Sequence, residues 1–125
     1  MSGSLAPYHA HIYYSAEERP RAERLSQDFR DNPEILFVGR MTDSGVGPHP
    51  LPQFEVHFVE RLRSDVIDAI AASGLRALVH PLTDDDVADH TTSAHWIGQP
   101  LELDVSTLDP PGHNQGIPRF GKSDF

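Results

Sequence analysis

Histidine is the residue type with the greatest capacity for chemistry in this sequence, and two of its eight histidines lie two positions apart near the N-terminus. The run from Tyr8 to Tyr14 is rich in aromatic residues and is followed by a polar stretch, a pattern typical of a β-strand. Alternate side chains of a strand project from one face, so His9, His11 and Tyr13 share a face. Because neutral imidazole is the commonest metal ligand in proteins, this face could supply two ligands to a metal ion.

The elements that position these side chains follow from hydrophobic periodicity and turn signals. We expect strands at 8–14, 35–41, 53–59 and 75–80. Ser15 and Glu18 have the spacing of a capping box for a helix that begins between residues 16 and 20, and Ser64 is expected to cap a second helix that ends at Gly74. This order of strands and helices is the signature of a ferredoxin-like α+β sandwich, β-α-β-β-α-β, with a C-terminal extension.

The ferredoxin-like topology brings more polar residues to the histidine face. Its strands lie in the spatial order fourth, first, third, second, so His9 and His11 of the central strand lie opposite His80 of the fourth strand and opposite Glu55 and His57 of the third. Neighbouring strands are about 4.8 Å apart, so these side chains could meet around one ion. The two helices should cover the opposite face, which carries Ala10, Ile12, Val56, Phe58, Ala77 and Val79.

The segment after the fourth strand is more weakly patterned. We expect Thr83 to cap a short helix that ends at Asp89, and a fifth strand at 100–105. This extension could fold over the open face of the sheet as a lid. The tail at 109–125 is rich in glycine and proline and is expected to be irregular, with His113 on the surface.

Composition narrows the classes of protein that the chain could belong to. With 125 residues, 38% of them hydrophobic, we expect a single domain over 1–125 with its core at about 8–103. The absence of cysteine excludes disulfides, thiolate metal sites and a cysteine nucleophile. A net charge of −9 disfavours nucleic acid and anionic membranes as partners. Without a signal-peptide profile or an apolar run of about 18 residues, we expect a cytoplasmic protein that does not contact the membrane.

Four short segments stand out by their order and spacing. They are Tyr8-His-Ala-His11, Gly47-Pro-His-Pro50 followed by Phe54-Glu-Val56, Leu78-Val-His-Pro-Leu-Thr83, and Asp89-His90 followed by Ala94-His-Trp-Ile-Gly98. Together, over roughly residues 8–103, they resemble the DOPA 4,5-dioxygenase family. The matching family positions are His9, His11, His49, Glu55, His80 and His90. His57 and His95 are not positions of the family pattern.

The resemblance implies an extradiol dioxygenase that cleaves a catechol with O₂ at a non-haem Fe(II) centre, a site that zinc or another divalent metal can also fill. It implies His11, His80 and Glu55 as metal ligands, with His9 as a ligand or the neighbour of one. His49 or His90 would be the catalytic acid or base. The residues expected to contact the substrate are Tyr13, His57, Arg76 and Trp96, with Arg76 available to a substrate carboxylate.

Two alternatives compete with extradiol cleavage. Intradiol dioxygenases bind ferric iron through two tyrosines and two histidines, but strand alternation leaves only Tyr13 on the histidine face, which argues against that type. The other alternative is a non-catalytic ferredoxin-like module that binds a small ligand or a metal as a dimer. We expect a homodimer in either case, because the open sheet face needs cover. The sequence does not distinguish DOPA, caffeate, protocatechuate or an unrelated catechol as the substrate.

Overall fold

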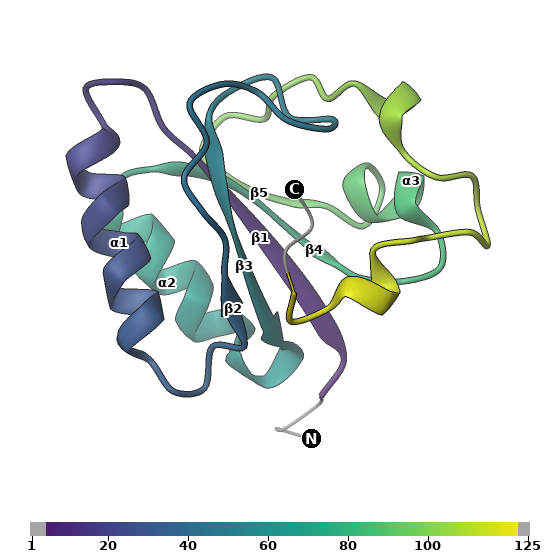
Figure 1. The fold of residues 1–125 in the computed structure, drawn as a ribbon, viewed down its shortest axis with the longest axis horizontal. Coiled ribbons are helices and arrows are strands. Elements are labelled where there is room, and N and C mark those ends of the chain that lie inside the picture. The colour runs from purple at the N-terminus through teal and green to yellow at the C-terminus, as the bar shows by residue number, and fades with distance from the viewer. Residues whose placement is uncertain (1–4, 123–125) are drawn as a thin grey trace.

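Five strands form one antiparallel sheet in the order β2-β3-β1-β4-β5 (Figure 1). The structure is a computed structural model that describes residues 5–122. The strands are β1 (Pro7–Tyr13), β2 (Phe37–Val38), β3 (Gln53–Val59), β4 (Arg76–Pro81) and β5 (His95–Ile97). The helices are α1 (Arg19–Asp31), α2 (Arg63–Ser73) and α3 (Asp86–His90), with 3₁₀ turns η1 (Glu60–Leu62), η2 (Val105–Thr107) and η3 (Ile117–Arg119).

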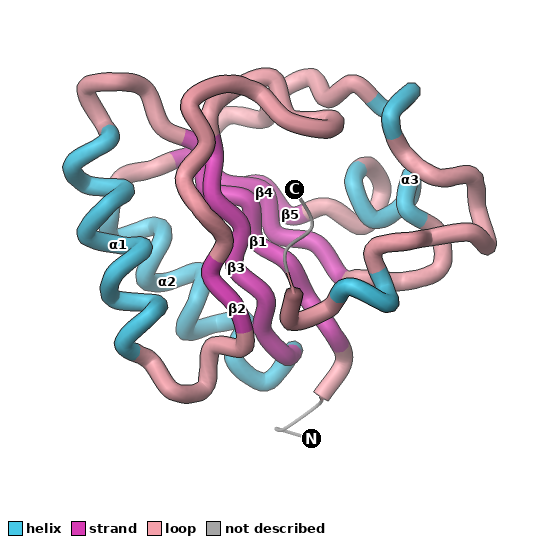
Figure 2. Tube along the Cα trace, in the orientation of Figure 1, coloured by secondary structure: helices cyan, strands magenta, loops and turns pink. Residues whose placement is uncertain are grey.

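The predicted ferredoxin-like topology is confirmed, with β5 added at the β4 edge. Helices α1 and α2 cover one face of the sheet, whereas α3 and the segment from η2 onward lie on the opposite side (Figures 1 and 2). The helix-covered face carries the hydrophobic core, which includes Ala10, Ile12, Val56, Phe58, Ala77 and Val79 as the alternation predicted. Among residues 5–122, none of the helices has the length and hydrophobicity needed to traverse a lipid bilayer.

The helix ends follow the local sequence in one case and depart from it in another. The two hydrogen bonds of the predicted capping box form, since the Glu18 N–H donates to Ser15 Oγ at 3.2 Å and the Ser15 N–H donates to Glu18 Oε1 at 2.9 Å. They close the turn before the helix, however, because the N-cap of α1 is Glu18, which has no side-chain cap bond. The prediction that Ser64 caps the second helix is wrong. The turn η1 runs directly into α2, so Leu62 is the N-cap and Ser64 lies inside the first turn. At the other end Gly74 adopts a left-handed conformation with φ of 75°, as predicted.

Three further boundaries differ from the predictions. Strand β2 is shorter than 35–41, although the Gly39 N–H still donates to Glu55 O at 2.8 Å beyond its end. The fifth strand lies at 95–97 instead of 100–105, because Gly98, with φ of 80°, turns the chain away from the β4 edge. Helix α3 is capped by Asp85, whose side chain accepts from the Ala88 N–H, and not by Thr83.

The face of the sheet opposite α1 and α2 is covered by the chain itself. The loop between β2 and β3, helix α3 and the segment after η2 all lie on this side (Figure 1). The expected lid is therefore present, but it is built from more of the chain than the extension to residue 105. The homodimer stays a prediction. Because the chain itself covers the open face of the sheet, the need for cover from a second copy no longer supports it.

Candidate functional site

The strand register brings the predicted residues together on the face away from α1 and α2. His9 of β1 lies opposite His57 of β3 and His80 of β4, and His11 lies opposite Glu55. All five side chains are buried, with exposed fractions of 3% or less. The convergence of polar side chains from three strands, expected from alternation and topology, is confirmed.

The hydrogen bonds of three histidines fix which ring nitrogen carries the proton. His80 Nδ1 donates to Pro81 O at 2.7 Å, and His90 Nδ1 donates to Asp86 O at 2.8 Å. His11 Nδ1 donates to Gln53 Oε1 at 3.0 Å. In a neutral imidazole only one nitrogen is protonated, so each ring presents a lone pair at Nε2. Metal-binding histidines in proteins are commonly held by this kind of bond from Nδ1.

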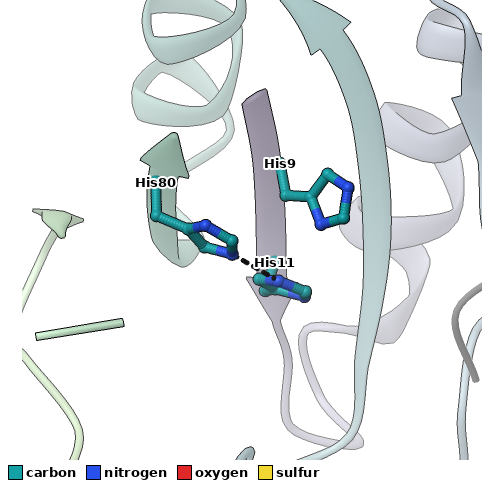
Figure 3. Close-up of side chains that lie close together, drawn as sticks. All are labelled: His9, His11 and His80. Carbon is teal, nitrogen blue, oxygen red and sulfur yellow. Dashed lines mark hydrogen bonds between the residues drawn. The ribbon is translucent and has the colours of Figure 1, made fainter. Parts of the chain in front are cut away.

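Two of these lone pairs meet at the centre of the site. His11 Nε2 and His80 Nε2 are 3.1 Å apart, the contact drawn as a dashed line in Figure 3. A proton shared between them would require one ring to be an imidazolium. Burial lowers the pKa of both rings well below the ordinary value, and neighbouring histidines lower it further. Both rings are therefore neutral at neutral pH, and a bound cation would satisfy both lone pairs.

His9 completes a set of three imidazoles suited to a metal ion. Three ring nitrogens, one from each of His9, His11 and His80, lie within 4.8 Å of one another. Nitrogens bound to one ion at about 2.1 Å lie roughly 3.0–3.4 Å apart, so small side-chain movements would complete the geometry. His9 is 1% exposed, its Nε2 has no hydrogen-bond partner among the described residues, and burial lowers its pKa. The donor set fits a divalent transition metal.

A second cluster joins His11 to His49 and His90, with ligand atoms again within 4.8 Å of one another. His49 comes from the loop between β2 and β3, and the Tyr13 hydroxyl lies 2.7 Å from its Nδ1. Burial and the nearby His90 lower the pKa of His49 to about 3. Burial also raises the pKa of Tyr13, which keeps its hydroxyl protonated. The predicted acid–base histidines thus lie directly beside the candidate ligands.

Glu55 and His57 form a third cluster with His9 instead of joining His11 and His80. His57 Nδ1 accepts from the Gly121 N–H at 2.9 Å, so its proton is on Nε2, which lies 3.3 Å from Glu55 Oε2. The His57 ring also stacks on His9, with centroids 3.9 Å apart and planes inclined by 10°. In this tautomer Nε2 carries the proton and the Nδ1 lone pair accepts from the Gly121 N–H, so neither nitrogen of His57 offers a lone pair to a metal ion.

A cavity of about 230 Å³ opens onto the histidines. Its wall combines site histidines with residues from three loops: His9, His11, Gly47, Pro48, His80, Leu82, Asp86, His90, Thr107, Leu108, Asp109, Asn114, Gln115, Gly116 and Arg119. This volume lies just below the roughly 300–1,000 Å³ of typical small-molecule pockets, and it suits a compound with one ring.

The four residues predicted to contact the substrate lie elsewhere. Tyr13 and Arg76 line a separate cavity of about 300 Å³, and Trp96 stacks on Tyr13 with ring centroids 6.1 Å apart. His57 is fully buried behind His9. None of these four lines the cavity that contains the histidines, and Tyr13 reaches the site only through its bond to His49.

Sequence reasoning missed the residues that the C-terminal segment contributes. Asn114 and Arg119 line the cavity, although the tail was expected to be irregular and received no role. No periodicity marks this segment. The buried Gln53, which orients His11, was also missed, although it alternates onto the same face as Glu55 and His57 and could have been found from that pattern.

These features define a small ferredoxin-like protein with a buried polyhistidine centre at the base of a partly open cavity. A family model described as the Dopa 4,5-dioxygenase family matches residues 8–107, and the chain belongs to this family. The resemblance inferred from the four sequence segments is therefore confirmed, and family membership supports a dioxygenase.

Individual relatives agree with this assignment. The chain is 33% identical over 124 residues to an uncharacterized 21.2 kDa protein of Botryotinia fuckeliana, covering 86% of this chain and 66% of that protein. It is 26% identical over 118 residues to a DOPA 4,5-dioxygenase of Amanita muscaria, covering 86% and 52%. The chain thus spans less than two thirds of the length of either curated relative. The crystal structure of a "putative dioxygenase" from Nostoc punctiforme has a TM-score of 0.76 at 33% identity, covering 82% of this chain and 90% of that one.

Proposed function

We propose that this protein is an extradiol dioxygenase that opens the ring of a catechol with O₂ at a non-haem Fe(II) centre. The observation that carries the proposal is the 3.1 Å approach of two neutral imidazole nitrogens, His11 Nε2 and His80 Nε2, each with its lone pair directed into the site. A cation between them turns an unfavourable contact into two metal–ligand bonds. Membership in the Dopa 4,5-dioxygenase family supports the choice of reaction.

Three histidines would hold the metal: His9, His11 and His80. Bound Fe(II) would supply Lewis-acid binding of the two catechol oxygens and electron transfer to dioxygen. The predicted carboxylate ligand, Glu55, instead lies beside His57 and His9. We assign Glu55 to orienting His57, whose ring stacks on the ligand His9.

The remaining residues of the site handle protons and exclude water. His90 Nε2 carries a lone pair, because Nδ1 donates to Asp86 O, so His90 can accept a proton from a catechol hydroxyl and later return it. His49 is the second candidate for this role, held at Nδ1 by the Tyr13 hydroxyl. His90 lines the cavity, and His49 lies beside His90 and His11.

The reaction balances without a further reductant. The bond that breaks joins one hydroxyl-bearing carbon to its ring neighbour that carries no hydroxyl. Both oxygen atoms of O₂ enter the product, and the catechol supplies the electrons. The product is a ring-opened semialdehyde acid.

The test is anaerobic loading with Fe(II), measurement of bound metal, and then oxygen uptake with DOPA, caffeate, protocatechuate and 4-methylcatechol. We expect one O₂ consumed per catechol together with the visible absorbance of a ring-opened product. His11→Ala and His80→Ala should lose both bound iron and activity, whereas His95→Ala, an exposed histidine on β5, should keep both. If the wild type binds iron and no catechol consumes oxygen, ring cleavage is wrong and the non-catalytic binding module takes its place.

A further inference from the structure

The imidazole of His49 differs from its neighbours in the hydrogen bond at Nδ1. In His11, His80 and His90 this nitrogen donates to a carbonyl oxygen. In His49 it faces a hydroxyl group instead, because Tyr13 Oη lies 2.7 Å from Nδ1. A hydroxyl can donate or accept, so the direction of this bond decides whether His49 presents a proton or a lone pair at Nε2.

The Tyr13 hydroxyl is the donor in this bond. Tyr13 is 1% exposed, and among residues 5–122 its hydroxyl makes no other hydrogen bond. If His49 donated from Nδ1, the buried hydroxyl hydrogen of Tyr13 would have no acceptor, which costs free energy. Tyr13 therefore donates, Nδ1 of His49 carries the lone pair, and the proton of the neutral ring is on Nε2.

Separate parts of the fold hold the two partners of the bond. Tyr13 lies in the central strand β1, and its ring stacks on Trp96 of β5 with centroids 6.1 Å apart and planes inclined by 17°. The backbone N–H of His49 donates to Val46 O at 2.9 Å and closes a turn in the loop between β2 and β3. The sheet thus fixes the donor and the turn fixes the backbone of the acceptor.

The Nε2–H of His49 lies within the histidine cluster. This nitrogen is buried, and the centroid of its ring lies 4.1 Å from that of His11 and 6.0 Å from that of His90. His90 has the opposite tautomer, with its lone pair at Nε2, because its Nδ1 donates to Asp86 O. The cluster therefore contains one ring that donates from Nε2 beside another that accepts there.

We propose that Tyr13 is a positioning residue that keeps His49 as a hydrogen-bond donor, so that the two candidate acid–base histidines have different roles. The proton leaves the catechol hydroxyl for Nε2 of His90, and the Nε2–H of His49 stabilises the negative charge left on oxygen. His49 then offers no lone pair to the metal ion, and it affects metal binding only through the ring of His11, against which it packs. This assignment of roles rests on the proposed function, whereas the tautomer of His49 does not.

The first test measures the tautomer in metal-free protein, independently of any reaction. Long-range ¹H–¹⁵N correlation spectra of the imidazole rings show which nitrogen carries the proton, and the signals missing from His49→Gln identify His49. We expect the proton on Nε2 in the wild type, and a shifted Nδ1 resonance in Tyr13→Phe, which lacks the donating hydroxyl. The matched control, Tyr14→Phe, removes a buried hydroxyl that donates to Thr42 O in the same loop, and it should leave the His49 signals unchanged. A proton on Nδ1 of His49 in the wild type would overturn the inference.

The second test separates a donor from a base by substitution with glutamine, whose amide donates a hydrogen bond but does not take up a proton. After loading with Fe(II), His49→Ala should lower kcat for DOPA by about 100- to 1,000-fold, and His49→Gln should recover to within about 10-fold of the wild type. His90→Gln should stay about 100- to 10,000-fold below the wild type. Bound iron, measured separately, should be the same in His49→Gln as in the wild type.

The outcomes separate this inference from the proposed function. An inactive His49→Gln with the wild-type amount of iron would overturn the donor role, because the reaction would then require a lone pair or a proton acceptor at residue 49. If the wild type consumes no oxygen with any catechol, the proposed function and the assigned roles both fail. The hydrogen bond from Tyr13 to His49 would still be decided by the spectra of the metal-free protein.

Discussion

Lowering the pH should unfold the metal-free protein steeply, because its fold depends on histidines that stay neutral. His9, His11, His49 and His80 all have pKa values lowered chiefly by burial. Above about pH 6.5 these groups are neutral in both the folded and the unfolded state, so stability is fully present. Below pH 6.5 the unfolded chain takes up protons that the folded chain does not. The free energy of unfolding therefore falls with pH until the folded-state pKa is reached.

His49 gives the clearest magnitude. Its pKa falls from 6.5 to about 3, and at roughly 1.4 kcal/mol per pKa unit this corresponds to about 5 kcal/mol of stability that is lost between those two pH values. Each of the four histidines that remains neutral in the folded state contributes a slope of about 1.4 kcal/mol per pH unit. Together they give a slope of up to about 5–6 kcal/mol per pH unit. With a total stability of about 5–15 kcal/mol, the protein should unfold within a few pH units below 6.5.

The assay is urea denaturation at intervals from pH 8 to pH 5, with a chelator present, on wild type, His49→Gln and the control His113→Gln. His113 is an exposed histidine of the C-terminal segment 107–121. The free energy of unfolding of His49→Gln should depend on pH less steeply than that of the wild type, by about 1.4 kcal/mol per pH unit below pH 6.5, whatever its absolute stability. Equal slopes for wild type and His49→Gln would refute the reasoning, because His49 would then bind its proton equally in both states.

Two further predictions concern the segments that cover the site. Asp89→Ala removes the acceptor for Thr83 and Asn114 and should destabilise the protein by about 2–4 kcal/mol. Limited proteolysis should then cleave the C-terminal segment 107–121 faster than in the wild type. Unchanged cleavage would mean that Asp89 does not anchor this segment. Gly45→Ala would place a Cβ 2.5 Å from His49 O, so the loop must shift. The metal affinity of the Gly45→Ala variant, measured by calorimetry, should fall by about 10-fold or more, because His49 is displaced from the site. An unchanged affinity would show that His49 takes no part in metal binding.

The convergence of five polar residues could be predicted because it depends on only two regular features. Strand residues alternate with a period of two, and the ferredoxin-like topology determines which strands are neighbours. His9 and His80 come together for these reasons alone, with no information from loops. The same alternation correctly assigned Ala10 and Ile12 to the core.

The remainder of the site could not be predicted from periodicity because it depends on irregular backbone. His49 and His90 come from a loop and a single-turn helix, and they were identified by family resemblance. Asn114 lines the cavity and donates to the buried carboxylate of Asp89, a tertiary contact that no local pattern encodes. The role of His57 depended on the Gly121 N–H, a single hydrogen bond that decides which of its nitrogens carries the proton.

The central strand joins the stability of this protein to its chemistry. β1 presents Ala10 and Ile12 to the helices and His9 and His11 to the cavity, so one strand supplies both the core and the metal-binding face. A shift of register by one residue would exchange the two sets, which would bury imidazoles against α1 and α2 and expose the site to aliphatic side chains. The hydrophobic face therefore fixes the position of the histidines more firmly than their own contacts do. Since burial of neutral imidazoles costs stability below pH 6.5, that core must supply the free energy that keeps His11 and His80 close together before a metal binds.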